Sequence, residues 1–355
     1  MAPAACQALL LPALNYRLLL LTAALLLGVP LLFRALLPTP PPPLPKACGA
    51  WLDAHYPLLP EGGAQRALHN FGVDVTDAAV DASQALPFYD LVMVVPSVAS
   101  AAGRARRDSV RSAFSVSTGL VPWARVKLLF VLAPPAVAWE GAEAELARQD
   151  VLRVRDCADD DAGATPTSSS STTCKVLAAL AHVAAQYRFH FLARIGDDAH
   201  FRLDQFLARV APAHVAGGAH AANLVMAYWS RSTQDNPSNN VELAAQREAY
   251  GVWAFPRYPH GMGYVLSSSV VHSLVRTHAE VGLADGFPED GVVGLWLAGL
   301  STTSVARVDS PCFGNVEPHV LGVRGCQDEA ILVHYMTPHL WGQVNGQGRL
   351  PYCAY

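Results

Sequence analysis

Apolar and polar residues divide the chain into three parts. Residues 17–37 are almost wholly apolar, and about 20 such positions can span a bilayer when a flanking arginine extends toward the interface. They predict a signal-anchor helix after a cytoplasmic tail of residues 1–16, with a cleaved signal peptide as the alternative. A proline-rich run follows, so residues 38–86 are predicted to form a stem and residues 87–355 a globular domain, with a packed extension of that domain as the alternative for residues 46–86.

Within residues 87–355, short apolar runs alternate with stretches of helical periodicity. The strands are predicted at 88–96, 126–132, 189–195, 223–229 and 330–335. The helices are predicted at 101–114, at 173–187 with Thr173 as the N-cap, and at 292–300. This alternation predicts an α/β domain with a mostly parallel central sheet.

Charge and cysteine content narrow the class of protein. The formal net charge is −4, so no basic field is present to attract nucleic acid, and that partner class is set aside. Six of the seven cysteines follow the apolar segment, and none forms a zinc-binding pattern. Up to three disulfides are possible, and short loops favour Cys157–Cys174 and Cys312–Cys326. Buried free thiols are the alternative.

Two carboxylates, Asp197 and Asp198, come directly after the predicted strand 189–195. In an open α/β sheet, ligands bind beyond the carboxyl ends of the strands. Adjacent carboxylates repel one another unless a cation lies close, and a hard divalent ion bridging to a diphosphate fits this requirement. A solvated turn is the alternative.

The acidic run 159–161 lies in a flexible polar context and is interpreted as a solvated loop.

Two further motifs suggest sugar chemistry. Gly261 and Gly263 allow the backbone to approach a ligand closely, and Tyr264 is one of the aromatic residues around them. Glu289 and Asp290 precede an apolar helix, where a carboxylate can accept the proton of an attacking hydroxyl. The alternatives are a turn before a core segment and a favourable interaction with the helix dipole.

Arginines and one histidine complete the candidates. Arg107 and Arg111 share a helix face, and they either bind phosphate or, as we favour, pair with acidic residues elsewhere. His334 lies late on a predicted strand, where a histidine is more often a core residue than a ligand.

These motifs resemble the β1,3-galactosyltransferase and β1,3-N-acetylglucosaminyltransferase family (glycosyltransferase family 31) over about residues 88–340. Residues 106–114 resemble its RRxxIRxTW segment, 194–201 its KxDDDxF segment, 260–267 its GxGYVLS segment and 289–294 its EDVxxG segment. Lys175 is similar to the lysine of its LTLKT segment. The sequence around His334 also resembles trypanosomatid phosphoglycan β1,3-galactosyltransferases.

The resemblance implies a GT-A nucleotide-sugar-binding fold and an inverting, Mn²⁺-dependent transfer of galactose or N-acetylglucosamine. The donor would be a UDP-sugar and the acceptor a glycan hydroxyl, joined in β1,3 linkage. The resemblance also implies a single-pass type II protein of the Golgi membrane with its catalytic domain in the lumen.

The same resemblance assigns roles to individual residues. Asp290 would be the general base, and the metal ligands would be Asp198 and, as a weaker candidate, His334. Substrate and nucleotide contacts would come from five residues: Asp197, Gly261, Gly263, Tyr264 and Glu289.

Two positions depart from the family pattern. Gly196 stands where the family has the first Asp of its triplet, and His200 moves the aromatic residue one place along to Phe201. A non-catalytic lumenal protein that keeps the fold and binds glycan or UDP-sugar is therefore the alternative function. A soluble secreted enzyme is a third hypothesis.

Overall fold

The computed structural model describes residues 48–70, 86–134, 139–157, 169–216, 223–230, 256–281, 289–300, 305–315 and 330–347. All of them belong to one compact unit, Lys46–Tyr355. The predicted signal anchor at 17–37 lies outside the described residues. No helix within the described ranges is long and apolar enough to cross a membrane.

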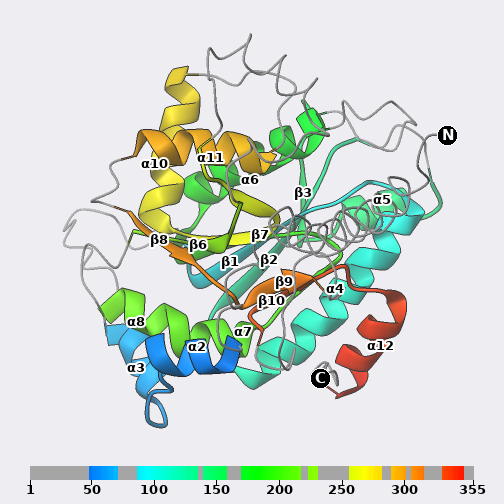
Figure 1. Ribbon diagram of the computed structural model, residues 1–355. Coiled ribbons are helices and arrows are strands. Elements are labelled where there is room, and N and C mark those ends of the chain that lie inside the picture. Colours follow the sequence, from blue (N-terminus) through cyan, green and yellow to red (C-terminus); the bar gives the residue numbers. More distant parts are fainter. Residues whose placement is uncertain are drawn as a thin grey trace, which may run out of the picture. The chain divides into compact units, whose positions relative to one another are not determined.

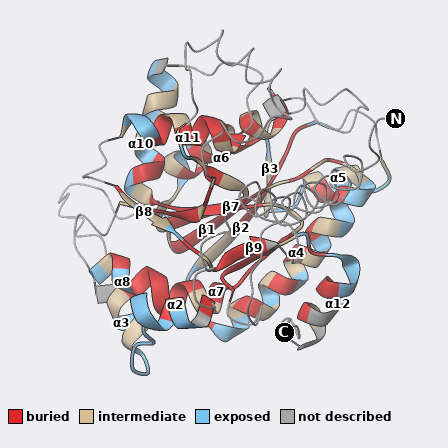
Figure 2. Ribbon diagram, viewed as in Figure 1, coloured by how far each residue is buried: buried red, intermediate tan, exposed pale blue. Residues whose placement is uncertain are grey.

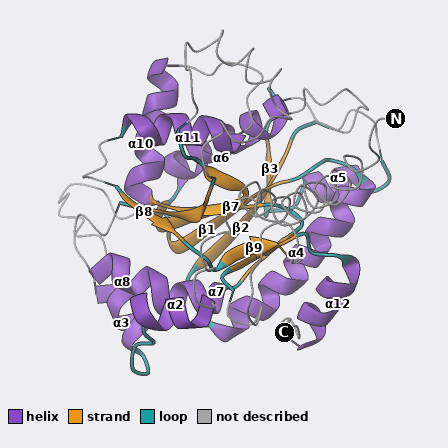
Figure 3. Ribbon diagram, in the orientation of Figure 1, coloured by secondary structure: helices purple, strands orange, loops and turns teal. Residues whose placement is uncertain are grey.

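A seven-stranded mixed sheet forms the centre of this unit (Figures 1 and 3), in the order β3-β2-β1-β4-β7-β6-β8. Its strands are β1 Phe88–Pro96, β2 Val126–Leu132, β3 Val151–Arg153, β4 Arg188–Ile195, β6 Leu224–Trp229, β7 Pro259–Ser267 and β8 Ala306–Asp309. Strand β7 runs antiparallel to both of its neighbours, and every other pairing in this sheet is parallel. The predicted α/β class and mostly parallel central sheet are confirmed.

A second, three-stranded sheet has the order β5-β10-β9. Its strands are β5 Ala199–Phe201, β9 Phe313–Asn315 and β10 Leu332–His334. Because β5 follows β4 after a short turn and pairs antiparallel with β10, His334 lies opposite Ala199. This pairing brings the late histidine next to the acidic turn.

Helices cover both faces of the central sheet (Figure 1). On one face lie α6 Ser169–Gln186, α10 Ser268–Val281 and α11 Glu289–Gly299. On the other lie α2 Cys48–His55, α3 Gly63–Asn70, α4 Ala101–Leu120, α7 Leu203–Gln205, the π-helical turn η2 Phe206–Val210, α8 Ala211–Ala216 and α12 Pro338–Gln347. A short helix, α5 Ala142–Leu146, precedes β3.

Strand β1 shows why its sequence is an unbroken apolar run. Leu91, Met93 and Val95 pack into the core on the α4 side, whereas Val92 and Val94 pack into the core on the α6 side. A strand that is buried on both faces cannot alternate apolar and polar residues. Figure 2 shows the same burial across the middle of the sheet.

Several predicted boundaries differ from the structure. Helix α4 continues to Leu120, and α6 begins at Ser169, so Thr173 lies inside the helix and is not its N-cap. Strand β10 covers only 332–334 of the predicted 330–335. The segment around Gly261 is not a turn but part of strand β7, which pairs with β4 and β6.

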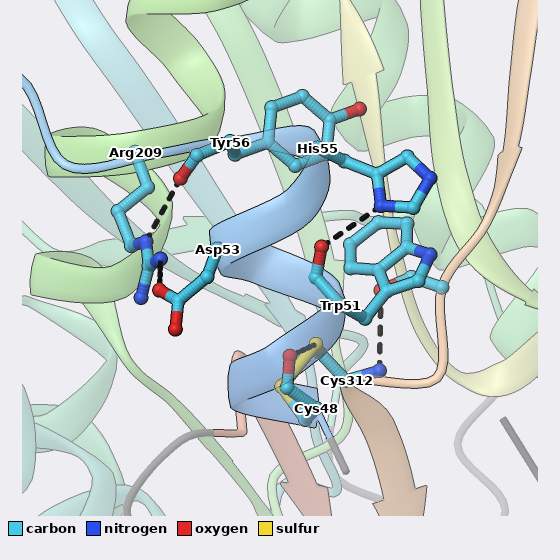
Figure 4. Close-up of a disulfide and its surroundings, with 8 residues drawn as sticks. Cys48, Trp51, Asp53, His55, Tyr56, Arg209 and Cys312 are labelled. Carbon is cyan, nitrogen blue, oxygen red and sulfur yellow. Dashed lines mark hydrogen bonds and ion pairs between the residues drawn. A yellow bond between two sulfur atoms is a disulfide. The ribbon is translucent and has the colours of Figure 1, made fainter. Parts of the chain in front are cut away.

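The compact unit begins at Lys46, which agrees with the alternative that residues 46–86 form a packed extension of the domain. Leu52 of α2 and Leu68 of α3 are fully buried. Arg209 donates to the carbonyl oxygen of Tyr56 at 3.0 Å and forms an ion pair with Asp53 (Figure 4). These contacts attach residues 48–70 to the helical layer.

Two disulfides are present in the described chain. Cys157–Cys174 confirms the prediction from its short loop. Cys312 pairs with Cys48 (Figure 4), so the predicted Cys312–Cys326 disulfide is wrong. The packing of α2 beside the start of β9 brings together two cysteines separated by 264 positions, which loop length alone does not favour.

Candidate active site

A cavity of about 250 Å³ opens at the carboxyl ends of β1 and β4. Its walls come from the loop after β1, from α4 and α6, from the turn after β4, and from Gly261 of β7 and His334 of β10. This is the edge of an open α/β sheet at which ligands are expected to bind. Asp197 and Asp198 both line the cavity.

Asp197 is held by a hydroxyl group and a cation. Ser97 Oγ donates to Asp197 Oδ2 at 2.6 Å, and Arg106 Nε lies 3.0 Å from the same oxygen. The Asp197 side chain is only 14% exposed, whereas that of Arg106 is 43% exposed. Asp197 therefore holds the Nε end of the Arg106 guanidinium, and Arg106, which lines the cavity, remains partly exposed to solvent.

Asp198 is paired with His334, whose Nε2 lies 3.3 Å from Asp198 Oδ1. Burial alone would raise the pKa of Asp198, but its hydrogen bond to His334 and the charge of that residue outweigh burial, so the pKa is lowered. The backbone N–H of Asp198 itself also lowers this pKa. Separately, the Met336 N–H donates to the Asp198 main-chain carbonyl at 2.8 Å and so attaches the turn to the segment after β10. Asp198 is thus an ionised carboxylate beside an imidazole nitrogen.

This donor set fits a divalent cation that also binds phosphate. Hard cations such as Mg²⁺ are commonly held by one or two carboxylates, with substrate phosphates and water completing the shell, and Mn²⁺ accepts similar oxygen ligands. No group of three or more His, Cys, Asp or Glu side chains in the described residues could hold a metal alone. Asp198 and His334 would therefore supply two ligands, and the substrate and water would supply the others.

Gly196 has a specific steric role in this arrangement. A Cβ atom added at residue 196 would lie 2.6 Å from Asp198 Oδ1. The Asp198 carboxylate therefore uses the space that a side chain at residue 196 would need. The absence of that side chain lets Asp198 turn back toward His334.

Arg194, Glu289 and Tyr264 form a buried network behind the cavity. Arg194 Nη2 lies 2.8 Å from Glu289 Oε2, the Arg194 Nη1 group donates to the Gly261 carbonyl, and the Tyr264 hydroxyl donates to Glu289. Arg194 lines the cavity, but Tyr264 and Glu289 do not. The polar atoms of these two predicted substrate contacts are directed to each other and to Arg194, so the structure places them as supports of the cavity wall.

Burial shifts the pKa values of this network. It raises the pKa of Glu289, with the nearby charge of Asp290 adding to the effect and Arg194 opposing it. It also raises the pKa of Tyr264 well above its usual value, which the charge of Glu289 reinforces. Tyr264 is therefore a neutral hydrogen-bond donor at physiological pH.

Asp290 lies directly beside the cavity wall at Gly261. Its Oδ1 accepts the Gly291 N–H at 2.8 Å, and a Cβ atom added at Gly261 would lie 3.1 Å from its Oδ2. Asp290 does not itself line the cavity, but the missing side chain of Gly261 leaves its carboxylate close to it. Burial raises the pKa of Asp290, opposed by N–H groups of Gly291 and Gly261 and by the charge of Arg194.

Gly263 allows strands to pack closely and does not line the cavity. Its φ is +155°, and an added Cβ would lie 2.5 Å from Leu332 Cδ1 and 3.0 Å from the Arg194 carbonyl oxygen. Only glycine lets β7 approach β4 and β10 this closely. The structure therefore separates the two glycines of the motif, since Gly261 lines the cavity and Gly263 sustains the packing behind it.

The favoured structural role of Arg107 and Arg111 is confirmed. Arg107 is fully buried, with Nε 2.8 Å from Glu145 Oε1 and Nη1 donating to Ser97 Oγ at 3.0 Å. Arg111 contacts the same glutamate at 2.9 Å and Asp150 at 2.7 Å. Arg107 therefore acts on the site indirectly, by positioning the hydroxyl that holds Asp197.

Two cationic side chains that line the cavity, those of Arg106 and Lys175, were not identified as site candidates from the sequence pattern. Arg106 precedes Arg107 in α4, and its contact with Asp197 depends on how α4 crosses the end of β4. Lys175 of α6 is buried, lines the cavity and donates to the Ser97 carbonyl at 3.2 Å. Its only signal in the sequence was the family resemblance.

Comparisons with known proteins agree with the motifs. Residues 164–307 match the family model described as galactosyltransferase. A curated relative, beta-1,3-galactosyltransferase GALT1 of Arabidopsis thaliana, is 24% identical over 151 residues. That alignment covers 42% of this chain and 21% of the relative, so the chain matches only about a fifth of that protein's length.

A solved structure is also similar to the chain at low level. It is galactosyltransferase LgtC in complex with donor and acceptor sugar analogues, with 10% identity and a TM-score of 0.36. The match covers 74% of this chain and 96% of that one.

Proposed function

We propose that this chain is an inverting, metal-dependent hexosyltransferase, and its match to the galactosyltransferase family model over residues 164–307 supports this proposal. Its donor would be UDP-galactose or UDP-N-acetylglucosamine, and its acceptor a glycan hydroxyl. The family resemblance supplies the β1,3 linkage and the GT-A description of the fold. The structure contributes the cavity and the arrangement of the residues around it.

One observation carries the proposal. Asp197 and Asp198 lie in the same cavity as His334, which comes from a distant part of the chain, and Asp290 lies behind Gly261 at its wall. A solvated acidic turn would have no reason to meet a histidine, buried cations and a second carboxylate in one place. Convergent polar groups with shifted pKa values in a cleft are typical of an active site.

Mn²⁺ is the proposed cofactor, held by Asp198 and His334. When bound, it would supply positive charge that neutralises the donor diphosphate and so makes UDP a better leaving group. Arg106 and Lys175 provide fixed positive charge in the same cavity and would contact phosphate oxygens directly. Asp197 keeps Arg106 in place for this contact.

Asp290 is the proposed general base. It would take the proton of the acceptor hydroxyl as that oxygen forms a bond to the anomeric carbon of the donor sugar. The bond from the anomeric carbon to the phosphate oxygen breaks in the same step, and its electron pair leaves with UDP. Attack opposite to the leaving group gives inversion. Arg194 supports this geometry by binding the Gly261 carbonyl beside Asp290.

The proposed location is the Golgi membrane, with residues 17–37 as the anchor and the catalytic domain in the lumen. The apolar character of that segment supports this location. Two disulfides in the described chain also support it, because such bonds persist in the oxidising secretory pathway and are rare in the cytosol.

A transfer assay tests the proposal. The full-length chain, produced in a secretory host and purified in detergent, would be incubated with Mn²⁺ and UDP-galactose or UDP-N-acetylglucosamine. Methyl β-galactoside and methyl β-N-acetylglucosaminide would serve as acceptors, and UDP release and the mass of the product would be measured. We expect transfer with one donor, loss of transfer on chelation, and recovery with added Mn²⁺.

Gly196 favours a second candidate, a glycan- or UDP-sugar-binding protein without catalytic activity, since a family carboxylate is missing there. The same samples distinguish it. Binding of UDP with no turnover of either donor would support this candidate and reject the enzyme.

A further inference from the structure

Tyr335 has an unusual backbone conformation beside the proposed active site. Among the residues that the structure describes, it is the non-glycine residue with a positive φ, at +62°. A bulky side chain in the left-handed region is disfavoured, and residues of this kind often lie at functional sites.

The conformation follows from contacts on both sides of Tyr335. On one side, His334 ends β10 opposite Ala199 and its ring pairs with Asp198. On the other side, the Met336 N–H donates to the Asp198 carbonyl. The chain must therefore turn within one residue while both neighbours remain attached to the acidic turn, and Tyr335 is that residue.

The same turn places an aromatic ring outside the cavity wall. The Tyr335 ring centroid lies 4.0 Å from that of His334, with an interplanar angle of 31°. Tyr335 is nevertheless 49% exposed, although His334 lines the cavity. The exposed ring of Tyr335 is therefore the direct neighbour of a residue of the cavity wall.

We propose that Tyr335 is a binding residue for the acceptor, with its exposed ring stacking against the apolar face of a sugar. The inference rests on the proposed function and extends it to the acceptor. Tyrosine suits the role because it offers a large rigid surface with a polar tip at low entropic cost.

The layout of charge favours the acceptor over the donor. Arg106 and Lys175, which suit a diphosphate, lie inside the cavity, whereas Tyr335 does not line it. The volume of about 250 Å³ is small compared with common ligand pockets, which begin at roughly 300 Å³, so part of the bound substrates must extend past the mouth. A glycan chain is the substrate that continues into solvent.

Three substitutions separate the ring from the backbone strain. Tyr335→Gly removes the ring and relieves the strain, Tyr335→Ala removes the ring and keeps the strain, and Tyr335→Phe keeps both. Leu120→Ala is the matched control, because Leu120 is 52% exposed at the end of α4. Each full-length variant would be assayed with Mn²⁺, UDP-galactose or UDP-N-acetylglucosamine, and the two methyl glycosides.

We expect the acceptor KM to rise about ten-fold in Tyr335→Gly and Tyr335→Ala, because a ten-fold loss of affinity corresponds to the free energy of about one aromatic contact. In Tyr335→Phe and in the Leu120→Ala control, the acceptor KM should stay within about two-fold of the wild-type value. The donor KM should stay within the same range in every variant. A glycine variant with the wild-type acceptor KM would overturn the inference, as would a donor KM that rises as much as the acceptor KM.

Saturation-transfer NMR with the same methyl glycosides provides a readout that does not require turnover. If the wild type binds a glycoside without transferring sugar, the proposed function fails while the inference is judged by loss of the signal in Tyr335→Gly. If the wild type transfers sugar but the variants bind and react normally, only the inference fails. A wild type that neither binds nor glycosylates any glycoside overturns both.

Discussion

Asp198 Oδ1 lies 3.3 Å from His334 Nε2, and this contact joins the turn after β4 to the last strand of the small sheet. The two residues are far apart in the sequence but become neighbours because β5 pairs with β10. The contact converts an acidic turn into a mixed oxygen and nitrogen donor set. It is also the point at which a metal site can be tested most directly.

We predict that Asp198→Asn and His334→Ala each weaken Mn²⁺ binding at least ten-fold, because each removes one of the two proposed protein ligands. Calorimetric titration of Mn²⁺ in the presence of UDP would measure the effect. Asp108→Asn, on an exposed part of α4, is the matched control and should bind Mn²⁺ as the wild type does. Unchanged affinity in both site variants would refute the metal assignment.

Gly196→Ala should lower Mn²⁺ affinity and kcat by about ten-fold with little change in Tm. The added Cβ would lie 2.6 Å from Asp198 Oδ1, so the carboxylate would have to move away from His334. Gly119→Ala in α4 is the control, since its added methyl group meets nothing within 4 Å. Full activity in Gly196→Ala would show that the Asp198 position is not set by this space.

The pH profile should report on Asp290. A general base acts when deprotonated, so kcat/KM should fall as the pH falls through its pKa. Because burial raises that pKa, the decline should begin at a higher pH than for an ordinary carboxyl group. Asp290→Asn should lose the acidic limb and about 100-fold or more in kcat. Exposed Glu280→Gln should keep both, and an Asp290→Asn enzyme with the wild-type profile would exclude the role.

Arg194→Met should destabilise the fold by about 3 kcal/mol, since it leaves the Glu289 carboxylate buried without its cation. Urea denaturation would measure the loss, and the double variant with Glu289→Met should recover part of it. Arg257→Met breaks an exposed ion pair with Asp309 and should cost less than about 1 kcal/mol. Equal losses in the two arginine variants would contradict the importance of the buried network.

The sequence predicts four strands of the central sheet, β1, β2, β4 and β6, because each is a continuous apolar run buried on both faces. It does not predict β3, β7 or β8: β3 and β8 are short, and β7 begins with the glycine-rich segment interpreted as a ligand-binding motif or a turn. Val92, Val94 and Leu129 lie in the core on the α6 side of the sheet, and their strand neighbours are buried on the opposite face. The resulting uninterrupted apolar runs can be recognised in the sequence without knowledge of the fold. The same feature located Asp197 and Asp198, since they follow directly after the apolar run of β4.

The rest depends on contacts between distant segments. Strand β10 is only three residues long, so no pattern in it indicates that His334 meets Asp198. Helix periodicity shows that Arg106 and Arg107 point in different directions but not which one reaches the cavity. The burial of Tyr264 and Glu289 likewise depends on α11 packing on β7, which local sequence does not reveal.

The Cys48–Cys312 bond has a practical consequence for anyone who shortens this chain. A version starting at residue 87 would retain every cavity residue yet lack the partner of Cys312. The unpaired Cys312 thiol would lie directly before β9, which pairs with the strand that carries His334. It could then form non-native disulfides during secretion. Inactivity of such a truncated protein would therefore not show that the active site is incompetent, because the truncation removes both this disulfide and the packing of α2 and α3.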